Sequence, residues 1–196
     1  MIRTYFNHRA AVWDETATEN NETNLRLMAE RLKIKPGARI LDVGTGTGVF
    51  LPFLLSEIGS NGQIVALDIA EEMLSKARAK GFNGNIDYLN ADVTNVPLPD
   101  ETFDNVVCYS SFPHFQDKSK ALGEINRVTK SGGRLLICHT SNRDSINQLH
   151  LGIPEVKNDF IPGEDEMQRM LVEAGFIDIR IEDNQENYLC QAWKPG

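Results

Sequence analysis

The sequence predicts an α/β protein in which a parallel β-sheet is covered by helices on both faces. Three observations lead to this fold class: short apolar runs alternate with segments of helical periodicity, a glycine-rich turn follows the first apolar run, and an aspartate ends the second. Repeated strand–helix–strand units need crossover connections, which give parallel strands with helices packed on the sheet. The chain of 196 residues has the length of one domain, and we expect a single domain over residues 1–196.

The elements follow one another in a regular order. Leu25, Met28, Ala29 and Leu32 recur at helical spacing before Pro36-Gly37, and a short apolar run then predicts the first strand. Gly132 and Gly133 end the fourth expected helix, and Gly175 ends the fifth. The expected strands are 39–43, 63–67, 86–89, 103–109, 134–139, 177–181 and 188–193, and the expected helices are 25–32, 49–58, 70–80, 118–129 and 164–174.

Two segments lack this regular pattern, the N-terminal residues 1–20 and the region 140–163. Ligands of parallel sheets bind in the loops at the carboxyl ends of the strands. We therefore expect residues 1–20 to form an arm or lid and residues 140–163 to form an insertion on the substrate side.

Composition and charge exclude several classes of function. The net charge of -8 and the absence of a Lys or Arg run argue against a nucleic-acid partner. No apolar stretch reaches the roughly 20 residues of a membrane span, and residues 1–8 do not resemble a secretory signal, so we expect a cytoplasmic protein. Cys108, Cys138 and Cys190 are widely spaced, which predicts reduced, buried thiols.

The glycine turn, with Gly44, Gly46 and Gly48 preceded by Asp42, predicts a ligand that lies against the main chain at a helix N-terminus. Its third glycine comes one residue too early for the G-x-G-x-x-G fingerprint of nicotinamide enzymes, and no lysine follows it to complete a P-loop. Asp68 ends the next strand, where a doubly wound fold places an acid against ribose hydroxyls; capping of the following helix is an alternative, compatible role.

A third signal follows the next strand. There Asp92 can accept a hydrogen bond from an exocyclic amine, and Val93 can pack on a purine face. Aspartate is also common in turns, so the order of the three signals carries more weight than this one alone.

Together these stretches resemble the class I S-adenosylmethionine (SAM) dependent methyltransferases, and among them the small-molecule type that includes the quinone-biosynthesis C-methyltransferases. The resemblance covers roughly residues 25–140. The matching stretches are Leu41-Asp42-Val43-Gly44-Thr45-Gly46-Thr47-Gly48, Asp68, Ala91-Asp92-Val93, Leu98-Pro99-Asp100-Glu101-Thr102-Phe103-Asp104 and Glu124-Ile125-Asn126-Arg127-Val128-Thr129-Lys130-Ser131-Gly132-Gly133.

The resemblance implies a Rossmann-like three-layer sandwich with a seven-stranded, mostly parallel sheet whose last strand is antiparallel. It also implies SAM as the cofactor. The glycine turn would line the methionine and ribose part, Asp68 would hold the ribose hydroxyls, Ile69, Asp92 and Val93 would frame adenine, Asp42 would support the turn or the methionine amino group, and Ser110 would contact the methionine portion. The implied cofactor set is Asp42, Gly44, Thr45, Gly46, Gly48, Asp68, Ile69, Asp92, Val93 and Ser110.

Methyl transfer is an in-line displacement that needs alignment and exclusion of water, and a general base when the acceptor must lose a proton. The candidate bases are His114, His139 and His150, because two follow neighbouring strands and the third lies in the region 140–163. A structural role for each histidine stays open. So does a metal, although no ligand spacing enforces one and we expect none.

Other residues of the ends suggest how the acceptor is chosen. Tyr5, Phe6 and Trp13 either close over the sulfonium or only attach the arm to the domain. Polar residues of the insertion either select a polar acceptor or belong to surface turns, and three phenylalanines either favour an apolar acceptor or pack in the core. These residues are Asn142, Arg143, Asp144 and Asn147 in the first group and Phe112, Phe115 and Phe160 in the second.

The leading hypothesis is therefore a methyltransferase acting on a small-molecule acceptor, as a monomer or homodimer. Two alternatives remain from the sequence: a nicotinamide-dependent oxidoreductase, which the early third glycine and the missing Tyr-x-x-x-Lys pair disfavour, and a module that binds SAM without catalysis.

Overall fold

A computed structural model describes residues 2–16 and 21–196 of the chain. Its described strands form one seven-stranded sheet in the order β3-β2-β1-β4-β5-β7-β6. β7 runs antiparallel to both of its neighbours, and the other pairings are parallel. The predicted mostly parallel sheet with an antiparallel last strand is confirmed. The strands are β1 (Arg39–Val43), β2 (Gln63–Asp68), β3 (Ile86–Asn90), β4 (Phe103–Tyr109), β5 (Thr129–His139), β6 (Ile177–Asp183) and β7 (Tyr188–Trp193).

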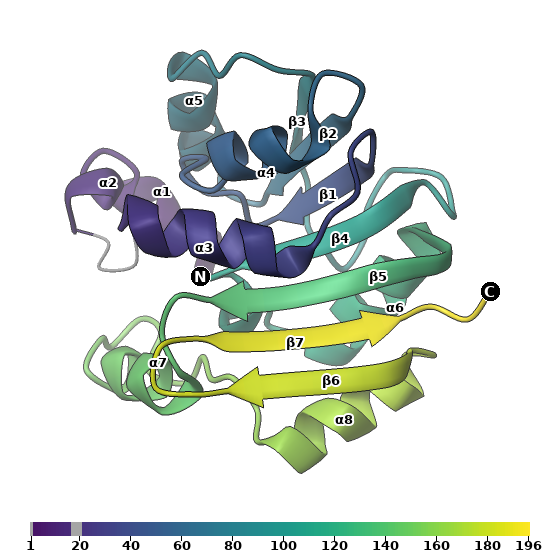
Figure 1. Cartoon of the computed structure of the whole chain (residues 1–196). Helices are drawn as coiled ribbons and strands as arrows, with labels where there is room; N and C mark the ends of the chain where they lie inside the picture. Colours follow the sequence, from purple (N-terminus) through teal and green to yellow (C-terminus); the bar gives the residue numbers. More distant parts are fainter. Residues whose placement is uncertain (1, 17–20) are drawn as a thin grey trace.

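The sheet has a buried core on each face, which makes the fold a three-layer sandwich (Figure 1). Successive strand side chains point to opposite faces. Leu41 therefore packs with α6 (Lys118–Val128) and α8 (Glu164–Glu173), whereas its neighbour Ile40 packs with α3 (Glu22–Leu32) and α4 (Leu51–Ile58). The remaining central helix, α5 (Glu71–Ala79), contacts β2 and β3.

The two ends of the chain are more regular than the sequence predicts. The arm contains α1 (Ile2–Arg9) and α2 (Trp13–Thr16), while its residues 1 and 17–20 lie outside the described part. The region 140–163 was expected to be irregular, but it begins with the helix α7 (Arg143–Leu151). Ile146 and His150 are its only buried residues and one of them is polar, so the sequence has no row of apolar core positions here that would indicate a helix.

One boundary also differs from the prediction. The helix expected to end at residue 129 stops at Val128, and β5 begins directly at Thr129 instead of at residue 134. Thr129 pairs with Phe103, so the added residues extend the contact between β4 and β5.

The helices α1, α2 and α7 gather at one end of the sheet (Figure 1). This is the end toward which the parallel strands run, so the segments that differ most from the prediction surround the loops in which α/β proteins bind ligands.

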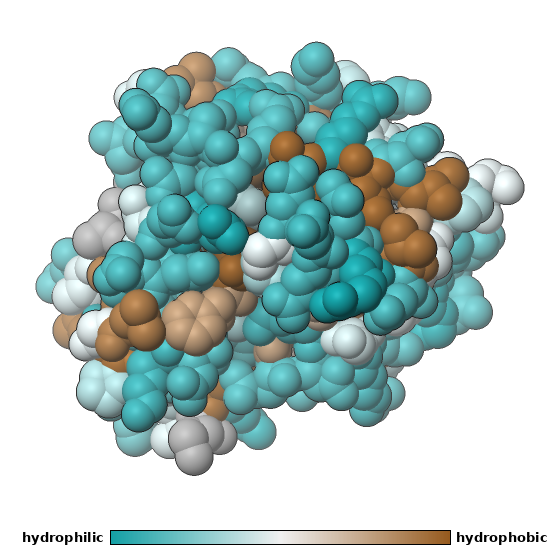
Figure 2. Space-filling model, turned by 90° about the horizontal axis from the view of Figure 1, so that it is seen from below, coloured by the Kyte–Doolittle hydropathy of each residue, from teal (hydrophilic) through white to brown (hydrophobic). Residues whose placement is uncertain are grey.

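The face shown in Figure 2 is hydrophilic over most of its area, with hydrophobic side chains interspersed. The exposed large apolar residues of the described chain come from several elements: Val12, Leu27, Leu149, Leu151, Val172 and Ile177. None of the described helices is long and apolar enough to span a bilayer.

Candidate functional site

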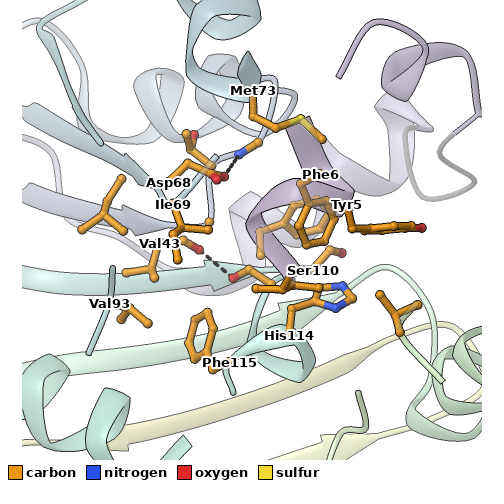
Figure 3. Close-up of a pocket in the computed structure, with 18 of the residues that line it drawn as sticks. Tyr5, Phe6, Val43, Asp68, Ile69, Met73, Val93, Ser110, His114 and Phe115 are labelled. Atoms are coloured by element: carbon orange, nitrogen blue, oxygen red, sulfur yellow. Dashed lines mark hydrogen bonds between the residues drawn. The ribbon is translucent and has the colours of Figure 1, made fainter. Parts of the chain in front are cut away.

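A cavity of about 520 Å³ lies at the carboxyl ends of the central strands. Its wall combines the turn after β1, the end of β2, the residues that follow β3 and β4, and parts of α1 and α7. Asp68, Ile69 and Val93 lie on one side of it, whereas Tyr5, Phe6 and His114 lie on the other (Figure 3). Segments far apart in the sequence therefore build one site with two sides.

The glycine turn is packed against the loop after β4. At Gly44 φ is +72°, and an added Cβ would lie 2.4 Å from Cβ of Ser111. The Ser111 hydroxyl in turn donates a hydrogen bond to the carbonyl oxygen of Val43 at 2.6 Å. Gly46 has open space where its Cβ would be, so the main chain there is accessible to a ligand.

The carboxylate of Asp68 fixes this turn to the end of β2. Oδ2 accepts a hydrogen bond from the Gly46 N–H and Oδ1 accepts one from the Ala70 N–H, each at 2.8 Å. Burial raises the pKa of Asp68 to about 6, although the backbone N–H groups oppose this shift. A carboxylate oxygen accepts more than one hydrogen bond, so Asp68 retains capacity for two ligand hydroxyls.

Asp42 and Gly48 lie behind the cavity wall and not on it. Burial raises the pKa of Asp42 to about 7; the Thr45 hydroxyl lowers it, and the charge of Asp68 adds to the rise. At Gly48 an added Cβ would meet the Phe82 ring at 2.8 Å. Gly48 therefore does not line the cavity, and its contact with the ligand stays a prediction. The place of Asp42 behind the wall agrees with the first of its two predicted roles, support of the turn.

The other residues of the predicted cofactor set line the cavity: Gly44, Thr45, Gly46, Asp68, Ile69, Asp92, Val93 and Ser110. Ser110 has φ +50°, a conformation that residues other than glycine adopt at some cost. Met73 and Thr94 also line this side, and no motif of the sequence indicated them.

All three candidate histidines line the same cavity, as the predicted topology required. Nδ1 of His114 lies 2.9 Å from Oδ2 of Asp159, and the His114 and His150 ring centroids are 4.8 Å apart. Burial lowers the pKa of His114; the hydrogen bond to Asp159 opposes this, and His150 and His139 reinforce it. His139 is buried at the end of β5 with its ring 6.3 Å from that of Tyr188.

Asp159 is the main site residue that the sequence did not reveal. It is buried in a segment without periodicity, and its role depends on a contact with His114 across 45 positions of the chain. Several apolar side chains on the same side of the cavity were also missed: Ile2, Ile146, Leu149, Ile153 and Val156.

The polar residues suggested as acceptor ligands have structural contacts instead. Asn142 accepts a hydrogen bond from the Ser145 N–H and caps α7, and Arg143 pairs with Asp144 and Asp183. Asn147 bonds the main chain of Ile161. None of the four lines the cavity, which agrees with the second alternative, that these residues belong to surface turns.

Of the three phenylalanines, Phe115 lines the cavity and Phe112 is buried in the core beside it. Phe160 does not line the wall. Within the ranges that the structure describes, no group of three or more His, Cys, Asp or Glu side chains is arranged to hold a metal ion.

The aromatic residues of the arm cover the cavity. The Phe6 ring packs edge to face on Tyr5, Trp13 and His114, with centroids 5.0–5.4 Å apart. Arg3 binds Glu71 at 2.8 Å, and Asp14 contacts Lys80 at 2.7 Å and the Thr47 hydroxyl. The arm is thus attached to α5 and to the glycine turn, so both readings of the aromatic residues, as cover and as attachment, agree with their contacts.

The sheet order, the cavity at its carboxyl edge and the glycine turn bonded to an acid on the second strand are typical of Rossmann-like proteins that bind nucleoside-containing ligands. A family model described as a methyltransferase domain matches residues 41–137. Residues 41–137 form a methyltransferase domain of the class I SAM-dependent type. SAM is accordingly the cofactor, and the nicotinamide alternative is not retained.

Two relatives are named ubiquinone/menaquinone biosynthesis C-methyltransferase UbiE. The protein from Teredinibacter turnerae is 40% identical over 112 residues, which are 55% of this chain and 45% of the relative. The protein from Pasteurella multocida is 32% identical over 170 residues, which are 73% of this chain and 63% of the relative. The chain thus spans about half the length of the curated relatives it matches.

Solved structures agree on the fold. A SAM-dependent methyltransferase from Aquifex aeolicus has a TM-score of 0.72 and 28% identity, with 89% of this chain and 94% of that chain covered. The phosphoethanolamine N-methyltransferase 2 of Haemonchus contortus, in complex with S-adenosylhomocysteine, has a TM-score of 0.77 at 18% identity and covers 98% of this chain and 58% of its own. The second likeness concerns the fold alone.

Proposed function

We propose that this protein transfers a methyl group from SAM to a carbon atom of a small aromatic acceptor, with His114 as general base. The acceptor class follows the names of the relatives, which are C-methyltransferases of quinone biosynthesis. The observation that carries the proposal is that one cavity is lined by Asp68 and the glycine turn on one side and by His114 on the other. A donor and an acceptor bound there would lie side by side.

The cofactor fits the Asp68 side of the cavity. Bound SAM supplies a methyl group activated by a positively charged sulfur. Asp68 would accept hydrogen bonds from the ribose hydroxyls, and the open main chain at Gly46 would allow close approach. Ile69 and Val93 would pack on adenine, with Asp92 near its amine, while Ser110 would face the methionine portion.

The acceptor fits the His114 side, where α1, α7 and residues 153–156 present apolar side chains. Such a wall would orient a planar ring and keep water from the reacting atoms. A ring carbon becomes more nucleophilic when a ring hydroxyl gives up its proton, and His114 would take that proton. The carbon–methyl bond would form as the sulfur–methyl bond breaks, and the proton on the same ring carbon would then move to the ring oxygen and restore the aromatic hydroxyl. Because burial holds the pKa of His114 below its ordinary value, the ring is neutral at pH 7 and ready to act as a base.

The proposal is tested by following S-adenosylhomocysteine formation while the protein is incubated with SAM and a panel of quinols and phenols. We expect turnover with at least one ring acceptor and a methyl group on carbon in the product. Binding of SAM without turnover on any acceptor would favour the non-catalytic module. The cytoplasmic location, the lack of a nucleic-acid partner and the monomeric or homodimeric state stay predictions from the sequence.

A further inference from the structure

We propose that Asp159 is a positioning residue that holds the proton of His114 on Nδ1 and thereby makes Nε2 the basic nitrogen. The inference rests on the proposed function of His114. It assigns a task to the segment after α7, where the sequence shows no motif.

The first step is the contact itself. Oδ2 of Asp159 lies 2.9 Å from Nδ1 of His114, and the two side chains are only 11% and 15% exposed. An ionised carboxylate accepts hydrogen bonds and has no proton to donate, so Nδ1 must carry the hydrogen. In a neutral imidazole the lone pair is then on Nε2.

The second step is the orientation of the ring. The Phe6 ring packs edge to face on His114 at 5.0 Å and an interplanar angle of 76°, and the His150 ring lies 4.8 Å away. His114 itself ends the short 3-10 turn Phe112–His114 that follows β4. With its backbone fixed and one nitrogen bonded, the ring has little freedom to flip.

The third step is how Asp159 reaches its place. Its N–H donates to the carbonyl oxygen of Val156 at 2.8 Å, and its own carbonyl oxygen lies 2.5 Å from Nδ1 of His150. Two residues further on, the side chain of Asn147 accepts from the Ile161 N–H at 2.9 Å and donates to the Ile161 oxygen at 3.1 Å. α7 therefore holds this segment at Asp159 itself, through His150, and two residues after it, through Asn147.

Other charged groups around the pair come from several elements. His150 on α7 and His139 at the end of β5 disfavour a proton on His114. Lys118 on α6, Tyr5 on α1 and the exposed Glu155 interact electrostatically with Asp159 or with its neighbours. Asp159 is the one described group whose interaction raises the pKa of His114, against burial and both histidines. If Asp159 were replaced, none of these neighbouring groups would therefore stabilise the proton on His114 in its place.

The test uses ¹⁵N NMR of the histidine rings in the full chain saturated with S-adenosylhomocysteine, with His114→Gln to assign the signals. In the wild type we expect a protonated Nδ1 and an unprotonated Nε2 above the titration midpoint of His114. In Asp159→Asn we expect a lower midpoint and a larger share of the Nε2–H form, because the amide is uncharged and can donate to Nδ1. Glu155→Gln, which removes a charge from the same segment, should change neither the titration midpoint of His114 nor the share of its Nε2–H form.

A wild-type Nε2–H form, or an Asp159→Asn spectrum identical to that of the wild type, would overturn the inference. The wild-type measurement decides the question even if the variant folds poorly. With an acceptor from the panel, Asp159→Asn should lower kcat about 10- to 100-fold with KM for SAM unchanged, and cause no further loss in a His114→Gln background. A further loss would mean that Asp159 does not act through His114.

The two proposals fail in different ways. Full turnover by His114→Gln would remove the general base from the proposed function. The NMR result would still decide whether Asp159 holds the ring.

Discussion

The two sides of the cavity are built in different ways. The cofactor side is held by main-chain hydrogen bonds within one compact unit, in which Asp68 joins the turn after β1 to the start of α5. The acceptor side is held by side chains from distant segments, as in the contacts of His114 with Asp159 and with Phe6. The proposed cofactor site is thus fixed by main-chain contacts, whereas a small number of side-chain substitutions would change the shape of the opposite wall.

The largest effect should come from His114→Gln, which breaks the acceptor side alone. Removal of a general base typically costs about 10²- to 10⁴-fold in rate, while the affinity for S-adenosylhomocysteine should stay within about twofold. Turnover and calorimetric titration measure the two quantities. His8→Gln, an exposed residue outside the cavity, is the matched control. Loss of cofactor affinity in His114→Gln would show that the two sides are not separable.

Asp68→Asn should impair the cofactor side alone, by weakening the hydrogen bonds to the ligand. Lost hydrogen bonds to a charged acceptor are worth about 1.5–3 kcal/mol, so affinity for S-adenosylhomocysteine should fall about 10- to 100-fold. Asp87→Asn, on the neighbouring strand β3 and exposed, should bind like the wild type. Equal affinities in the two variants would remove Asp68 from the ribose site.

Asp42→Asn tests a residue that lies behind the cavity wall, through the pH dependence of the free energy of unfolding. The pKa of Asp42 is raised to about 7 in the folded chain from an ordinary value of 3.8. Between these values the folded state holds more protons than the unfolded state, so the free energy of unfolding decreases as pH rises from about 4 to 7. The variant has no carboxyl group to titrate at this position, so its free energy of unfolding relative to the wild type should be about 4 kcal/mol higher at pH 8 than at pH 4.

Denaturant unfolding at the two pH values measures the Asp42 effect, and Asp87→Asn serves again as the exposed control. An equal difference between variant and wild type at both pH values would mean that Asp42 is ionised throughout this range.

Arg3→Gln should have the smallest effect. The Arg3–Glu71 pair joins the arm to α5 but is largely exposed, and such pairs contribute little and are screened by salt. We expect a small decrease in affinity for S-adenosylhomocysteine at low salt and none at 0.5 M salt. Lys35→Gln, exposed at the opposite end of β1, is the control. A large decrease that persists at high salt would show that the arm is part of the cofactor site.

The cofactor side could be predicted from the sequence because its signals are local. Gly44 and Gly46 follow a strand directly, and Asp68 ends the next one, so spacing alone brings them together. The acceptor side could be predicted only in part. The strand ends placed His114 and His139 correctly, but α7 has too few buried positions to show periodicity, and Asp159 depends on a tertiary contact.

The most direct test of the central claim is calorimetric titration of the wild-type protein with S-adenosylhomocysteine and, separately, with NAD. We predict saturable binding of one S-adenosylhomocysteine per chain and no heat from NAD. Binding of NAD without binding of S-adenosylhomocysteine would contradict the assignment of the glycine turn and Asp68, and with it the proposed function of the cavity.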